Sequence, residues 1–112
     1  IIITPGTVDI YNEKTLRASM GSVFRLNIKE TNIDELYKLK ETYKIVAADM
    51  SGYDINKYKI GDSLILAIGN EANGLSKDIR SLTETFVKIP MQGKIESLNA
   101  AIAASILMNK LS

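Results

Sequence analysis

The sequence has no cysteine, no histidine and no tryptophan, and only two prolines. Without cysteine there can be no disulfide, thiolate nucleophile or cysteine-based metal site, and without histidine the usual general base and metal ligand are missing. The 14 basic and 13 acidic residues leave a net charge of +1, so charge gives no argument for nucleic-acid binding. Nothing resembles a signal peptide or a membrane span, and a cytosolic protein is the default expectation.

The length of 112 residues predicts one domain, and a hydrophobic content of 46% is ordinary for a globular chain. The first residues are Ile1, Ile2 and Ile3, without an initiator methionine. An apolar run at this point is typical of a strand whose preceding segment has been removed. We therefore expect a piece of a longer protein.

The hydrophobic pattern predicts strands that alternate with helices, which is typical of an α/β fold with a mostly parallel sheet flanked by helices. The predicted strands are residues 1–3, 23–28, 45–48, 64–68 and 85–89. The predicted helices are residues 14–20, 32–44 and 77–82, and a last one that begins at Ser97. Asn32 and Glu35 fit a capping-box pattern at the start of the second helix. Residues 49–61 are predicted to be a loop.

The segment from 64 to 76 is the most informative of the chain. Five apolar residues, 64–68, indicate a strand buried on both faces, and a loop with two glycines and two asparagines follows them. Such a loop allows positive φ and exposes backbone N–H groups, with the carboxylate of Glu71 at its crown. Ligands of open α/β sheets bind just past the carboxyl ends of the strands, although an ordinary turn with a solvated glutamate fits the same pattern.

The last helix is apolar on nearly all sides, so it must be covered on more than one face. We predict that one face packs on the sheet and another forms a dimer interface; the alternative is that loops of the same chain cover it. Ser97 at its start either caps the helix or binds a ligand at the free N–H groups. Arg17, close to Gly21, is either a phosphate ligand or a solvated side chain.

Two long motifs resemble the second and third motifs of the SpoU (TrmH) family. They are Leu-Ala-Ile-Gly-Asn-Glu-Ala-Asn-Gly-Leu-Ser at 66–76 and Ile-Pro-Met-Gln-Gly-Lys-Ile-Glu-Ser-Leu-Asn-Ala-Ala at 89–101. Residues 14–24 are similar to the Arg-x-Ser-x-Gly segment of the same family. The members are SPOUT-class enzymes that transfer a methyl group from S-adenosylmethionine to a ribose 2′-hydroxyl of rRNA or tRNA.

The resemblance implies a C-terminal deep trefoil knot, with the last helix passing through a loop formed by residues 48–61, and a homodimer through that helix. It implies that four residues bind the cofactor, Ala48, Gly69, Ile89 and Leu98, with Asp49 nearby. It implies that four others line the catalytic face, Asn70, Glu71, Ser97 and Asn99. No metal is implied.

The chain departs from the family at the first motif, an Asn-x-Gly followed by an arginine that is thought to activate the ribose hydroxyl. The 112 residues have no counterpart of it, since Arg17 and Arg25 stand in other contexts. The resemblance therefore implies one SpoU-type domain without its N-terminal part, able to bind the cofactor but inactive alone. The alternative is a knotted module that dimerises and binds a nucleotide without catalysis.

Overall fold

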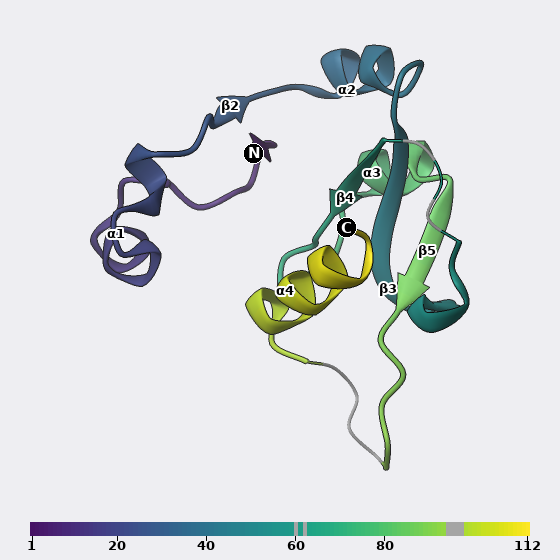
Figure 1. Ribbon diagram of the computed structural model, residues 1–112. Helices are drawn as coiled ribbons and strands as arrows, with labels where there is room; N and C mark the ends of the chain where they lie inside the picture. The colour runs from purple at the N-terminus through teal and green to yellow at the C-terminus, as the bar shows by residue number, and fades with distance from the viewer. Residues whose placement is uncertain (60, 62, 94–97) are drawn as a thin grey trace. The chain divides into compact units, whose positions relative to one another are not determined.

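The computed structural model describes residues 1–59, 61, 63–93 and 98–112, which form two compact units, Ile1–Leu36 and Tyr37–Ser112 (Figure 1). The elements that begin in the first unit are β1 (Ile2–Ile3), α1 (Glu13–Ser19), η1 (Ser22–Phe24), β2 (Lys29–Glu30) and α2 (Ile33–Leu39). Helix α2 continues past the boundary between the two units. The second unit contains β3 (Lys44–Asp54), η2 (Ile55–Lys57), β4 (Leu64–Ala67), α3 (Lys77–Leu82), β5 (Thr85–Lys88) and α4 (Ala100–Lys110). The predicted α/β class, with parallel strands and flanking helices, is confirmed.

In the first unit, β1 pairs in parallel with β2, with Ile2 opposite Lys29. The strand predicted over residues 23–28 is wrong. Met20 and Gly21 both have positive φ, and they turn the chain from α1 into the short 3-10 helix η1, which buries Val23. Apolar residues at 23, 24 and 26 imitated strand alternation, although Phe24 is 73% exposed.

Asparagine side chains cap both helices that begin in the first unit. The Asn12 side chain caps α1 by accepting a hydrogen bond from the Thr15 N–H. Asn32 accepts one from the Glu35 N–H at 2.9 Å, which confirms the capping pattern predicted there. The second helix ends at Leu39 rather than at 44, because turns follow it and Lys44 already pairs with β4.

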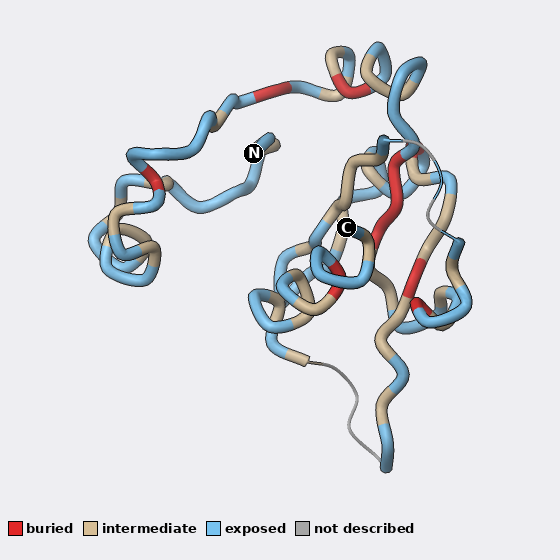
Figure 2. The backbone as a smooth tube through the Cα atoms, in the orientation of Figure 1, coloured by how far each residue is buried: buried red, intermediate tan, exposed pale blue. Residues whose placement is uncertain are grey.

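The sheet of the second unit has the parallel order β4-β3-β5. Its middle strand is β3, whose residues Ile45, Val46 and Ala47 are at most 1% exposed (Figure 2). Residues 64–68 were predicted to be buried on both faces. That prediction is wrong, since β4 flanks β3 and its four residues are half-buried.

The predicted loop at 49–61 is in part a strand. Val87 of β5 pairs with Ala48 and again with Tyr53, so residues 49–52 bulge out of β3 before pairing resumes. Gly52 is essential to this path, because a Cβ there would lie 2.6 Å from the Val87 nitrogen. Bulges re-aim side chains, and this one brings Asp49 and Met50 to the site described below.

Helix α4 packs on the sheet through Leu107, which forms a core cluster with Val46, Ile55 and Val87. The helix starts at Ala100 with Asn99 as its cap, so the predicted start at Ser97 is wrong; Ser97 itself lies outside the described residues. Two other apolar side chains of α4 are exposed, Ile102 by 53% and Met108 by 56%. Within the described part of the chain, no helix is both long and apolar enough to cross a membrane.

Candidate functional site

The second unit contains a cavity of about 480 Å³ at the carboxyl ends of its parallel strands. Five segments form its wall, namely the bulge of β3, the loop after β4, one residue of α3, the end of β5 with the residues after it, and the first turns of α4. The predominantly apolar side chains of this wall include Ile68, Leu75, Val87, Ile89, Leu98 and Leu107. A cavity of this size and character falls in the usual range of small-molecule sites, about 300–1,000 Å³.

The loop after β4 closes on itself through Asn70. Its N–H donates to the Gly74 carbonyl oxygen at 3.0 Å, and the Gly74 N–H donates back at 2.7 Å. The Asn70 side-chain oxygen accepts from the N–H groups of Ala72 and Asn73. Gly74 has the positive φ, +67°, that the sequence predicted for this loop. Asn70 therefore shapes the loop that carries Glu71.

Gly69 is required by the chain's own backbone. A Cβ at this position would lie 2.6 Å from the Gly74 carbonyl carbon and 2.7 Å from the Leu75 nitrogen. The absence of a side chain at Gly69 thus allows the loop to return against the end of β4.

Glu71 joins this loop to α4. One carboxylate oxygen, Oε1, accepts hydrogen bonds from the Asn99 side-chain nitrogen at 3.0 Å and from the Ala100 N–H at 3.2 Å. The side-chain oxygen of Asn99 accepts from the N–H groups of Ala101 and Ile102. Two side chains thus satisfy N–H groups at the start of α4, where a negative charge also interacts favourably with the helix dipole.

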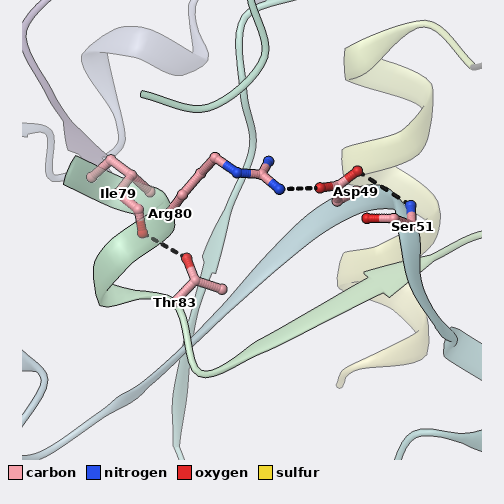
Figure 3. Close-up of polar contacts among 5 residues, drawn as sticks. All are labelled: Asp49, Ser51, Ile79, Arg80 and Thr83. Atoms are coloured by element: carbon pink, nitrogen blue, oxygen red, sulfur yellow. Dashed lines mark hydrogen bonds and ion pairs between the residues drawn. The ribbon is translucent and has the colours of Figure 1, made fainter. Parts of the chain in front are cut away.

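Asp49 and Arg80 form the second polar group of the wall. A guanidinium nitrogen of Arg80, Nη2, lies 2.7 Å from Asp49 Oδ2, and the Ser51 N–H donates to Oδ1 at 3.2 Å (Figure 3). The hydrogen bond from Arg80 is the main reason that the pKa of Asp49 lies below its ordinary value of 3.8. The same guanidinium lies over the Phe86 ring, 4.8 Å from its centroid.

The cavity brings together every predicted site residue that the structure describes: Ala48, Asp49, Gly69, Asn70, Glu71, Ile89, Leu98 and Asn99. Arg17 lies on α1 of the first unit, where it pairs with Glu13.

Sequence reasoning missed Arg80, Lys88 and Met50, which also line the cavity. Arg80 lies in the last turn of α3, four residues after the cap Ser76, but no local pattern says which segment this side of the helix meets. No local pattern indicated Met50, because its position depends on the bulge in β3.

The lining contains two carboxylates, Asp49 and Glu71, and two cations, Arg80 and Lys88. Its charges therefore balance, and its apolar walls suit a flat organic group with a few hydrogen-bonding groups. Such a site can bind and orient a nucleoside.

A family model described as the SpoU rRNA Methylase family matches residues 1–109. An uncharacterized tRNA/rRNA methyltransferase of Borreliella burgdorferi is 39% identical over 101 residues, which are 87% of this chain and 44% of that protein. The 23S rRNA (guanosine(2553)-2'-O)-methyltransferase RlmP of Bacillus subtilis is 32% identical over 99% of this chain and 46% of its own length. The chain spans about half the length of the curated relatives it matches.

Solved structures give the same likeness. An AdoMet-bound rRNA methyltransferase from Sinorhizobium meliloti superposes with a TM-score of 0.88 at 30% identity, over 99% of this chain and 44% of that one. The SpoU methyltransferase AviRb from Streptomyces viridochromogenes, in complex with AdoMet, superposes with a TM-score of 0.85 at 29% identity, over 98% and 47%.

Proposed function

The chain belongs to the SpoU rRNA Methylase family, and on this premise we propose that it is the cofactor-binding and dimerisation region of an S-adenosylmethionine-dependent RNA 2′-O-ribose methyltransferase. One observation carries the proposal. The two motifs at 66–76 and 89–101, far apart in the sequence, meet at one cavity at the carboxyl ends of parallel strands. This is where nucleotide ligands bind in α/β sheets.

The wall of the cavity fits the cofactor's chemistry. Apolar side chains from β5, α4 and the loops provide surfaces for an adenine ring, and the polar groups at Asp49 and Glu71 lie in the same wall. Relatives with the same fold are described with AdoMet bound. Ala48, Gly69, Ile89 and Leu98 are the residues that would hold the cofactor.

The bound cofactor supplies an electrophilic methyl group, and the protein must place a ribose hydroxyl in line with it. Asn70, Glu71 and Asn99 form the face of the cavity proposed for this task, together with Ser97, which lies outside the described residues. The hydrogen bonds of Glu71 and Asn99 favour a positioning role, because both side chains hold the start of α4.

The proposed substrate is rRNA or tRNA, as in the names of the relatives, and such an activity belongs in the cytoplasm. The hydroxyl that accepts the methyl group must also lose its proton. The 112 residues have no histidine and no counterpart of the family's first motif, so we expect this chain alone to bind the cofactor without turnover. Transfer of labelled methyl groups to total rRNA or tRNA by the purified chain would contradict that expectation, and Arg17 would then be the first residue to substitute.

We propose a homodimer through α4. Ile102 and Met108 are exposed on α4, the helix that the buried Leu107 anchors to the sheet. An apolar face of this kind gains free energy by pairing with its twin across a two-fold axis.

We also propose a deep trefoil knot, in which α4 passes through the loop formed by residues 48–61. The contact of α4 with η2, and the packing of Leu107 against Ile55, support it. The two compact units are proposed to belong to one SpoU-type domain, because the family match runs through both.

Calorimetric titration of the 112-residue chain with S-adenosylmethionine tests the proposed function. We expect saturable binding with a dissociation constant below about 1 mM. Ala103→Leu, which places a larger side chain in the wall, should weaken binding about tenfold or more, since overfilling a packed site costs roughly 1–3 kcal/mol. Ala18→Leu, an exposed helical position in the other unit, is the matched control.

Equal affinities of both variants and the original chain would refute this placement of the cofactor. Binding without transfer, even by a longer chain that contains the family's first motif, would favour the alternative of a non-catalytic knotted module that dimerises and binds a nucleotide.

A further inference from the structure

The carboxylate of Asp49 occupies a position that the β3 ladder alone would not give it. Because Val87 pairs with residues on both sides of the bulge, residues 49–52 are displaced from the sheet, and Asp49 lines the cavity. Its side chain is only 20% exposed. The bulge loses hydrogen bonds of the ladder between β3 and β5. Because bulges are over-represented next to active sites, this one favours a functional role for the carboxylate that it brings to the cavity wall.

Three elements fix the orientation of this carboxylate. Arg80 of α3 donates to Oδ2, the Ser51 N–H donates to Oδ1, and the Phe86 ring of β5 lies against the guanidinium (Figure 3 shows the first two contacts). At the end of α3, the Thr83 hydroxyl donates to the Ile79 carbonyl oxygen at 2.7 Å. Arg80 therefore projects from a capped helix end, and its charge is held between a carboxylate and a ring.

The local charge decides which ligand group suits Asp49. Arg80 already compensates its negative charge, and the other charged groups of the wall are Glu71 in the loop after β4 and Lys88 on β5. A cationic ligand group would gain little at a compensated carboxylate, whereas a neutral O–H donor needs only a free lone pair. The two carboxylate oxygens have four lone pairs in all, and the contacts with Arg80 and with the N–H and hydroxyl of Ser51 leave one of them for a ligand.

We propose that Asp49 accepts a hydrogen bond from a ribose hydroxyl of the nucleoside half of the bound cofactor, and that Arg80 is the positioning residue that holds Asp49 for it. The inference rests on the proposed function, because it assigns a group of that ligand to a corner of the same cavity. A carboxylate near the carboxyl end of a parallel strand reads ribose hydroxyls in other α/β folds. The apolar remainder of the wall is left for the base.

The test compares S-adenosylhomocysteine with its 2′-deoxy and 3′-deoxy analogues by calorimetry on the 112-residue chain. The original chain should bind at least one deoxy analogue about tenfold or more weakly, as expected for the loss of a hydrogen bond to a charged group. In Asp49→Ala, the parent compound should weaken to the level of that analogue, so the discrimination disappears. Asp78→Ala, a carboxylate of α3 that does not line the cavity, should keep the full discrimination.

A second variant separates positioning from simple support of the fold. Arg80→Gln should reduce the discrimination and should raise the pH below which affinity is lost, because Asp49 then protonates more easily. Arg80→Lys keeps a positive charge, so its discrimination and its pH limit should lie between those of the original chain and those of Arg80→Gln. Lys77→Gln, which removes a cation of the same helix that does not line the cavity, is the matched control.

Two outcomes would overturn the inference while the proposed function stands: equal affinity of the original chain for all three nucleosides, or full discrimination retained in Asp49→Ala. If Arg80→Gln left both the discrimination and the pH dependence unchanged, the positioning role of Arg80 would be refuted. Failure of the original chain to bind S-adenosylhomocysteine at all would instead contradict the proposed function, and the inference with it.

Discussion

The carboxylate of Glu71 accepts a hydrogen bond from the side chain of Asn99, 28 residues further along the chain, at 3.0 Å. This contact joins the loop after β4 to the start of α4, and with it the two motifs that carry the family resemblance. Both residues lie in the cavity wall. The polar residues at the site therefore also hold its shape.

Loss of the helix cap should be measurable in stability. Asn99→Ala should lower the free energy of unfolding by about 1 kcal/mol, the usual effect of removing an N-cap. Glu71→Gln should lower it by roughly 0.3–1 kcal/mol, through the lost interaction with the helix start. Because the two side chains are hydrogen-bonded, the double variant should lose less than the sum; urea unfolding measures all three. Glu84→Gln, outside the cavity, is the control, and strict additivity would show that the contact does not couple the two segments.

A side chain at position 69 should damage the loop after β4. Gly69→Ala places a Cβ 2.6 Å from the Gly74 carbonyl carbon, so the free energy of unfolding should fall by more than about 1 kcal/mol. Gly61→Ala meets no atom within 4 Å and should change it by less than about 0.5 kcal/mol. Thermal unfolding followed by circular dichroism compares them. Similar stability of the two variants would mean that the loop can open without cost.

Ionisation of Asp49 should stabilise the fold in a defined range of pH. Its pKa is lowered below 3.8, first by the hydrogen bond from Arg80, so its contribution is fully present above 3.8 and is lost as the pH falls through the lower folded pKa. In Arg80→Gln the pKa should return toward 3.8. Carbon-detected NMR of the carboxyl group measures both values. A pKa unchanged by the substitution would contradict the assigned cause.

The proposed dimer can be tested at two apolar positions of α4 that differ in exposure. Ile102 is 53% exposed, whereas Ile106 is half-buried. Ile102→Glu should give a folded monomer, and Ile106→Glu should also lower the unfolding temperature. Ala18→Glu, on α1, should remain dimeric. Light scattering measures the oligomeric state, and circular dichroism measures the unfolding temperature. A monomeric original chain would refute the proposed interface.

Local chemistry predicted much of this molecule. The helix at residues 77–82, the capping by Asn32 and the positive φ of Gly74 all follow from short patterns, because caps and turns are decided within a few residues. The site could be predicted at the ends of the strands because a parallel sheet gathers them at one edge.

The parts that could not be predicted depend on contacts between distant segments. The bulge at 49–52 exists because pairing of β3 with β5 resumes at Tyr53, and nothing local in Asp49, Ser51 or Gly52 distinguishes it from a loop. The pair of Asp49 with Arg80 spans 31 residues and requires that bulge. The prediction that residues 64–68 are buried on both faces failed for the same reason. The apolar content of a strand does not say whether β3 or β4 lies in the middle of the sheet.

Amide NMR of the ¹⁵N-labelled 112-residue chain, titrated with S-adenosylmethionine, tests the central claim most directly, namely that the cavity holds the cofactor. We expect saturable shifts at Ala48, Gly69, Ile89 and Leu98, while the amide of Glu84, a residue of the second unit outside the cavity wall, stays unchanged. Absence of any shift at millimolar cofactor, or shifts confined to residues 1–36, would contradict it.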